Sequence, residues 1–241
     1  MLALALAILP GILISVYIYY KDIHEKEPHR LLISCFVFGM LSTIPAIFLE
    51  EFGQGLGFTD TTNILIFAFV VVAGSEELVK FMFLRHYIYI KDDFNEPMDG
   101  IVYAVMIGMG FATLENILYV TSYGIETAMV RMFTAVPAHA AFAVIMGYYV
   151  GLAKFEQRKS AERRLLLMGF LGAVALHGAY DYFLFQQIYE GLAVLAFVSL
   201  IAGIYYGRDL IKRHQDDSPF KEGNGTDGTD KIDDLAHIVE D

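Results

Sequence analysis

Long apolar stretches separated by short polar loops make up most of the chain. Each stretch holds about twenty residues, enough for an α-helix to cross a hydrocarbon core of about 30 Å. Seven stretches are predicted to span a membrane: 2–20, 31–50, 64–88, 99–121, 129–153, 165–186 and 191–207. The pattern predicts an all-α, polytopic membrane helix bundle. We expect a transmembrane domain over 1–208 and an acidic, disordered cytoplasmic tail over 209–241.

The composition narrows the class of protein further. Of the 241 residues, 56% are hydrophobic and 19% are charged, against about 45–50% and about 25% in soluble domains. The net charge is −11, and proteins that bind nucleic acid need a basic face, so no nucleic-acid partner is expected. With Cys35 as the one cysteine, an intramolecular disulfide is excluded. The apolar composition instead predicts a lipid bilayer as the partner.

Lysine and arginine residues concentrate in alternate loops. They occur in four segments: 21–30, 89–98, 154–164 and the residues that follow 207. The intervening loops contain none: 51–63, 122–128 and 187–190. Because cytoplasmic loops carry the excess of these residues, we expect the N-terminus outside and the C-terminus in the cytoplasm. The first stretch has no basic start typical of a signal peptide, so it is expected to remain as an anchor.

Ionisable residues interrupt four consecutive predicted spans, where a charge at a helix centre costs about 2.5–3.5 kcal/mol on insertion. They are Glu76, Glu77 and Lys80, then Glu115, then His139, and finally His177 with Asp181. Side chains of this kind must face the bundle interior or a wet cavity. We therefore interpret them as one candidate functional site.

Helical spacing places these residues on inward faces. Glu76 and Lys80 are four apart, as are His177 and Asp181, so each pair shares a helix face. His139 lies on a stripe of small residues, which allow close helix approach in lipid: Ala135, Ala143, Gly147 and Gly151. With a rise of about 1.5 Å per residue, the site is expected near the membrane midplane, leaning outward.

Structural interpretations exist for several of these residues. Lys80 either reaches the interface with its ammonium group or neutralises Glu76. His139 taken alone is compatible with a structural residue, and Asp181 with one that only orients His177. The adjacent glutamates are harder to explain in this way. Two carboxylates with one lysine leave an unpaired acid, which suits general acid–base chemistry.

Three short motifs on these helices match a known pattern. EELVK from Glu76, FATLE from Phe111 and HGAYD from His177 fit EExxK, FxxxE and HxxxD. The set resembles the PrsW family of bacterial intramembrane proteases, distant relatives of the CAAX prenyl proteases. Two longer stretches are also similar: PMDGIVYAVMIGMGFATLENILY and VPAHAAFAVIMGYYVG, which contains His139. The likeness covers roughly residues 5–207 and leaves out the acidic tail.

The resemblance implies a site-1 type protease in the bacterial inner membrane. Its substrate would be a single-pass membrane protein, such as an anti-sigma factor of a stress response, cut near the outer side. If the roles of the matching family residues apply to this chain, Glu76 would be the general base on water and Glu115 would position that water. His177, oriented by Asp181, would polarise the scissile carbonyl. Glu77 and His139 would tune or complete the site, and the roles of Glu76 and Glu77 are interchangeable at this stage.

A metal-dependent version of the same site stays open. No Ser/His/Asp set lies at depth and no HExxH motif is present, which disfavours a serine nucleophile and excludes a common zincin. Three zinc ligands and a water position could come from one set: Glu76 or Glu77, Glu115, His139, His177 and Asp181. No cofactor is required by the glutamate mechanism, and zinc is the candidate cofactor of the metal-dependent mechanism.

Two other functions compete with proteolysis. Intramembrane acids and histidines also serve as proton relays, so a proton-coupled transporter is the main alternative. Inverted repeats would favour a carrier, and none is evident between the halves. The third interpretation is an intramembrane interaction protein, whose acids would have to pair with a partner helix.

Overall fold

The computed structural model describes residues 2–55, 63–186 and 190–221. Within these ranges the secondary structure is helical and contains no strand, as the apolar pattern predicts. The elements are α1 (Leu2–Lys21), α2 (His29–Gly55), α3 (Ile64–Ile66), η1 (Phe67–Val72), α4 (Ala73–Phe83), η2 (Leu84–Ile88), α5 (Pro97–Tyr123), α6 (Ile125–Arg131), α7 (Ala135–Phe155), α8 (Lys159–Phe185), η3 (Glu190–Leu192) and α9 (Ala193–Asp216).

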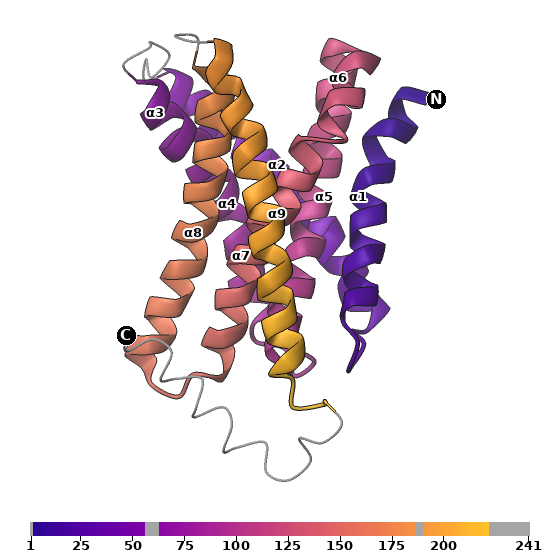
Figure 1. Cartoon of the computed structure of the whole chain (residues 1–241), viewed down its shortest axis with the longest axis vertical. Coiled ribbons are helices and arrows are strands. Elements are labelled where there is room, and N and C mark those ends of the chain that lie inside the picture. The colour runs from indigo at the N-terminus through magenta and orange to yellow at the C-terminus, as the bar shows by residue number, and fades with distance from the viewer. Residues whose placement is uncertain (1, 56–62, 187–189, 222–241) are drawn as a thin grey trace.

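Successive helical runs cross the bundle in alternating directions (Figure 1). Within the described ranges, six helices are long and apolar enough to cross a membrane: Leu2–Lys21, His29–Gly55, Pro97–Tyr123, Ile125–Phe155, Lys159–Phe185 and Ala193–Asp216. The expected count of seven is therefore approximate. The remaining predicted span, 64–88, is helical but is divided among α3, η1, α4 and η2.

The segment 64–88 departs from a regular α-helix on both sides of its charged residues. The flanking elements η1 and η2 are π-helices, which are rare and often occur at functional sites. Between them, α4 buries Glu76, Glu77 and Lys80. Helix α4 does not count among the apolar spans because it is 11 residues long and carries these three charges, although it lies within the bundle.

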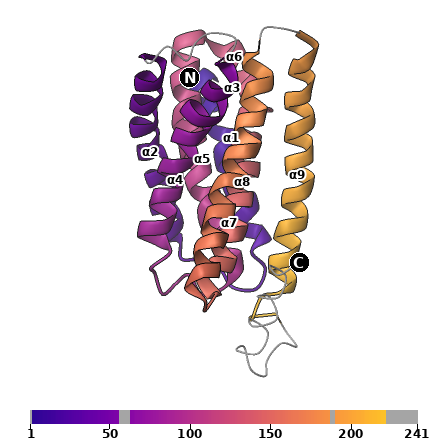
Figure 2. The ribbon, with the colours of Figure 1, turned by 90° about the vertical axis from the view of Figure 1, so that its left-hand side faces the viewer.

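Helix α5 forms the centre of the bundle, and most of its residues are buried. Figure 2 shows α2 and α9 on opposite sides of the molecule, with α5 between them. Gly100 of α5 packs against the backbone of Gly147 and Gly151 of α7, so the predicted small-residue stripe is a close helix contact. Large apolar side chains are exposed on the outer helices, as lipid contact requires: Leu13, Phe48, Phe52, Phe197 and Ile201.

The loops that carry lysine and arginine gather at one end of the bundle. His24 Nε2 lies 2.9 Å from the carbonyl oxygen of Gln215, and Lys154 Nζ donates to the Tyr89 carbonyl at 2.6 Å. The N-terminus lies at the opposite end (Figure 1). Helix α9 continues to Asp216, past the expected end at 207. The rest of the predicted tail, 222–241, lies outside the described residues.

Candidate active site

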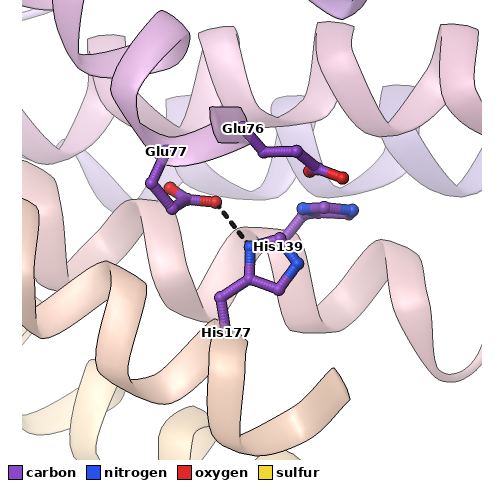
Figure 3. Close-up of side chains that lie close together, drawn as sticks. All are labelled: Glu76, Glu77, His139 and His177. Carbon is purple, nitrogen blue, oxygen red and sulfur yellow. Dashed lines mark hydrogen bonds and ion pairs between the residues drawn. The ribbon is translucent and has the colours of Figure 1, made fainter. Parts of the chain in front are cut away.

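Four buried side chains from three helices converge inside the bundle. Glu76 and Glu77 extend from α4, His139 from α7 and His177 from α8 (Figure 3). Each offers one oxygen or nitrogen atom, and these four atoms lie within 4.8 Å of one another. The two carboxylates of one helix and the imidazoles of two others, as expected from the sequence, therefore form one cluster.

Lys80 is the cation of this cluster. Its Nζ donates to Glu77 Oε1 at 2.8 Å and to Glu76 Oε2 at 3.0 Å. The same atom lies 3.2 Å from His139 Nδ1 and 3.9 Å from the centre of the Phe111 ring. Of the two interpretations of Lys80, neutralisation is confirmed, and the ammonium binds both glutamates instead of extending to the interface.

His177 lies between two carboxylates. Its Nδ1 is 2.9 Å from Glu77 Oε1 and its Nε2 is 3.2 Å from Asp181 Oδ2. The imidazole also stacks on the Phe142 ring, with centroids 4.5 Å apart and planes 16° apart. An imidazole can donate through both nitrogens only when it is doubly protonated. The surroundings of His177 therefore fix its orientation and favour a cationic ring.

Glu115 and Arg131 form the next layer of the site. Glu115 Oε2 accepts a hydrogen bond from Arg131 Nη2 at 2.6 Å and lies 3.0 Å from His139 Nε2. Arg131 Nε donates to Asn116 Oδ1 at 3.2 Å, and the guanidinium lies 3.9 Å from the centre of the Tyr119 ring. Glu115 thus links the central cluster to an arginine that three neighbours hold in place.

A cavity of about 770 Å³ leads to this cluster. Glu76, Glu115, His139, His177, Arg131 and Asp181 line it, whereas Glu77 is not part of its wall. The lining continues to Glu51 and Tyr123, which are exposed near the ends of α2 and α5. Those helix ends lie at the end of the bundle where α1 begins (Figure 1). The cavity therefore reaches the end opposite the lysine- and arginine-bearing loops.

All six residues predicted for catalysis lie in or beside this cluster. Four of them converge directly, Glu115 binds His139, and Asp181 binds His177. Sequence reasoning missed Arg131 and Glu50, which also line the cavity. Arg131 follows the loop 122–128, which contains no lysine or arginine, and this isolated cation was the available signal. Glu50 lies at the end of a predicted span, where an acid carries little information.

The donor set of the cluster fits a transition metal such as zinc. Zinc is bound by carboxylate oxygens and imidazole nitrogens, commonly with three protein ligands in catalytic sites. Of the residues considered as zinc ligands, Glu76, Glu77, His139 and His177 form the close group, whereas Glu115 and Asp181 lie outside it. Glu115 instead bonds to one of the histidines, as a residue that orients a metal ligand does.

The fold, this site and comparisons with known proteins together define a class: the protein is an intramembrane protease. The model of the PrsW family of intramembrane metalloproteases matches residues 27–204. The chain belongs to the PrsW family, as the motifs in its sequence indicate.

Relatives with the name Protease PrsW match most of the chain. The one from Geobacillus kaustophilus (strain HTA426) is 40% identical over 193 residues, covering 78% of this chain and 83% of that protein. The one from Bacillus subtilis (strain 168) is 36% identical over 183 residues, covering 73% and 80%. The one from Clostridioides difficile (strain 630) is 33% identical over 218 residues, covering 88% and 91%. No solved structure is a significant match to the chain.

Proposed function

We propose that this protein is a site-1 type endopeptidase that cleaves a single-pass membrane protein, such as an anti-sigma factor, near the outer face of a bacterial inner membrane. One observation carries the proposal. The Glu76 carboxylate lines a cavity that reaches the end of the bundle opposite the basic loops. Cytoplasmic loops carry the excess of lysine and arginine, so the cavity would open on the outer side.

The two adjacent glutamates have different surroundings, which supports separate roles. Glu77 Oε1 is shared between Lys80 and His177, so this carboxylate serves to hold two cationic groups. Glu76 has Lys80 as its hydrogen-bond partner and faces the cavity. We therefore assign Glu76 as the general base.

Hydrolysis then proceeds by attack of water followed by cleavage of the carbon–nitrogen bond. Glu76 accepts a proton from a water molecule in the cavity while the water oxygen attacks the carbonyl carbon of the scissile bond. His177, held between Glu77 and Asp181, would polarise the scissile carbonyl through its positive charge as negative charge develops on the carbonyl oxygen. Glu76 returns its proton to the amide nitrogen, and the carbon–nitrogen bond breaks.

The layer around Glu115 supports positioning of the water and of the substrate. Glu115 fixes His139 through a 3.0 Å contact and fixes Arg131 through a 2.6 Å ion pair. Arg131 presents a charged group on the cavity wall, where substrate carbonyl oxygens would pass. A bound metal, held by three of the residues Glu76, Glu77, His139 and His177, would supply Lewis acidity for the water and the carbonyl.

The test is cleavage of tagged single-pass membrane proteins by the purified protein in detergent. Glu76→Gln should abolish cleavage, and Glu51→Gln, at the exposed mouth of the cavity, should retain it. Cleavage that survives in Glu76→Gln would overturn the assignment of the base. Ion flux that depends on Glu76 in liposomes, without cleavage of any substrate, would instead support the transporter.

A further inference from the structure

Five acidic residues gather at the end of the bundle opposite the cavity. Asp22, Glu25 and Glu27 belong to the loop between α1 and α2, and Glu96 and Asp99 lie at the start of α5. Four of these side chains are buried, with exposed fractions of 2% or less, and Glu25 is half-buried. The site described above uses none of them.

Three of these carboxylates come together as a ligand set. Glu25, Glu27 and Asp99 each offer one oxygen atom, and the three atoms lie within 4.8 Å of one another. Every donor is a carboxylate oxygen, whereas the catalytic cluster contains two imidazoles. Oxygen ligands are those of hard divalent cations such as Ca²⁺ and Mg²⁺.

Protein donors orient these carboxylates through one oxygen and leave the other without a partner. The Tyr103 hydroxyl donates to Glu27 Oε2, and the backbone N–H groups of Asn95 and Glu96 donate to Asp99 Oδ2 at 2.7 and 2.8 Å. Among the described residues, no donor reaches Glu27 Oε1, Asp99 Oδ1 or Glu25 Oε2. Buried acceptors are normally satisfied, so these oxygens point to an additional ligand.

Asp22 and Glu96 also have carboxylate oxygens without a hydrogen-bond donor in the described part of the chain. Both carboxylate oxygens of Asp22 and Oε1 of Glu96 are also buried without a hydrogen-bond partner among the described residues. Two lysines lie near the cluster, but both donate to backbone carbonyls: Lys26 to Tyr19 at 2.6 Å and to Asp22, and Lys154 to Tyr89 at 2.6 Å. The two lysines therefore do not neutralise these carboxylate oxygens through hydrogen bonds, and the oxygens can bind another cation.

The electrostatics of the loop residues agree with the geometry. Burial, a hydrogen bond that protonated Glu27 shares with Asp99, and the nearby charges of Asp99, Glu25 and Asp22 raise the pKa of Glu27 to about 11. Burial and the charge of Glu96 raise the pKa of Asp22 to about 7. A buried charge is costly unless it is paired or coordinates a metal, so the cluster has to bind either protons or a cation.

We propose that Glu25, Glu27 and Asp99 bind one hard divalent cation, Ca²⁺ or Mg²⁺, with Asp22 and Glu96 adding charge around it. The cation would join the loop after α1 to the first turn of α5. Glu96 also accepts a hydrogen bond from Ser218, which follows α9. The site would therefore bind together the ends of three helices at the face of the bundle remote from catalysis.

The experiment uses the purified full-length chain in detergent after metal removal. Mn²⁺ serves as a paramagnetic probe of binding stoichiometry, and separate additions of Ca²⁺ and Mg²⁺ are followed by the thermal unfolding midpoint. Binding should be saturable and should raise the midpoint, and whichever of Ca²⁺ and Mg²⁺ displaces Mn²⁺ at the lower concentration is the preferred ion. No saturable Mn²⁺ binding, with no midpoint shift by either ion, would mean that protons alone neutralise the cluster and would overturn the proposal.

Variants assign the bound ion to this site. Glu25→Gln, at the half-buried position, should fold and should weaken Mn²⁺ binding at least tenfold, and Glu27→Gln should abolish it. Asp93→Asn, an exposed acid of the adjacent loop, should bind like the wild type. Glu76→Gln should also retain this equivalent of Mn²⁺, because the catalytic cluster is separate. Binding lost in Glu76→Gln and kept in Glu25→Gln and Glu27→Gln would place the ion at the catalytic cluster and overturn the proposal.

Discussion

Glu77 and His177 are one hundred positions apart in the sequence, and their Oε1 and Nδ1 atoms lie 2.9 Å apart. This contact joins α4 to α8 in the interior of the bundle. Because Lys80 binds the same Glu77 oxygen, one carboxylate holds together two groups that would otherwise repel each other. Several consequences of this arrangement can be measured.

Glu77→Gln should destabilise the protein more than Glu76→Gln does. The first change removes the charge that Lys80 and His177 share, whereas the second removes one of two glutamate partners of Lys80. Breaking a buried ion pair from one side costs about 3–5 kcal/mol. The free energy of unfolding in detergent checks this expectation. Equal losses in the two variants would contradict the shared role of Glu77.

Asp181→Asn should reduce kcat about 10- to 100-fold, with KM little changed. Asp181 acts through His177, because its carboxylate lies 3.2 Å from His177 Nε2. Without that carboxylate the imidazole would be less well oriented for the chemical step, so kcat decreases. Cleavage kinetics with a reconstituted substrate provide the measurement. Asp181→Glu should restore part of the rate, because the carboxylate is retained. A change confined to KM would identify Asp181 as a substrate-binding residue.

Arg131→Ala should impair cleavage at least tenfold, and Arg131→Lys should recover only part of it. The guanidinium binds Glu115 and Asn116 at once, and a lysine ammonium does not reproduce this fork. Removal of the arginine also leaves Glu115 with His139 as its remaining partner. Cleavage assays on both variants, with thermal unfolding as the check on folding, test this role. Full activity in Arg131→Ala would exclude it.

Gly147→Ala should destabilise the bundle by about 1–3 kcal/mol, as overpacking in a close contact does. An added Cβ would lie 2.6 Å from the Ile101 Cα and would also meet the Gly100 carbonyl, so α5 and α7 would have to separate. Gly55→Ala is the matched control, because an added Cβ there would lie more than 4 Å from every described neighbour. The unfolding midpoints of the two variants provide the comparison, and similar values would contradict the close packing.

Metal dependence can be tested at the same cluster. If zinc supports the reaction, a strong chelator should stop cleavage and added zinc should restore it, and Lys80→Met should bind zinc more tightly. The reason is that the Lys80 ammonium lies within 3.2 Å of atoms of Glu76, Glu77 and His139, three of the candidate ligands. Cleavage unaffected by chelation would assign the chemistry to the glutamate alone.

The sequence predicts the fold and the convergence of the buried charged residues for one physical reason. A charge in a membrane span is costly, so the few that occur mark the interior. Glu76, His139 and His177 could each be found in this way. Spacing by four residues also predicted the contact of His177 with Asp181, because helical periodicity determines which side chains share a face.

Other features depend on contacts between helices, which periodicity does not report. The different environments of Glu76 and Glu77 arise from where α8 places His177. The pairing of Glu115 with Arg131 depends on the turn between α5 and α6, where Gly124 has a φ of 89°. The π-helical turns beside α4 have no simple sequence signal either, and they divide the predicted span 64–88 into short elements.

The burial of charge in α4 has a consequence for biogenesis. When α4 leaves the ribosome, Lys80 can pair with its own helix, but His139 and His177 have not yet been made. At about 5–20 residues per second, the hundred residues up to His177 take roughly 5–20 s to synthesise. During that interval α4 carries two acids and one base. We therefore expect α4 to remain in contact with the insertion machinery or with other helices until α8 has been synthesised and His177 can bind Glu77.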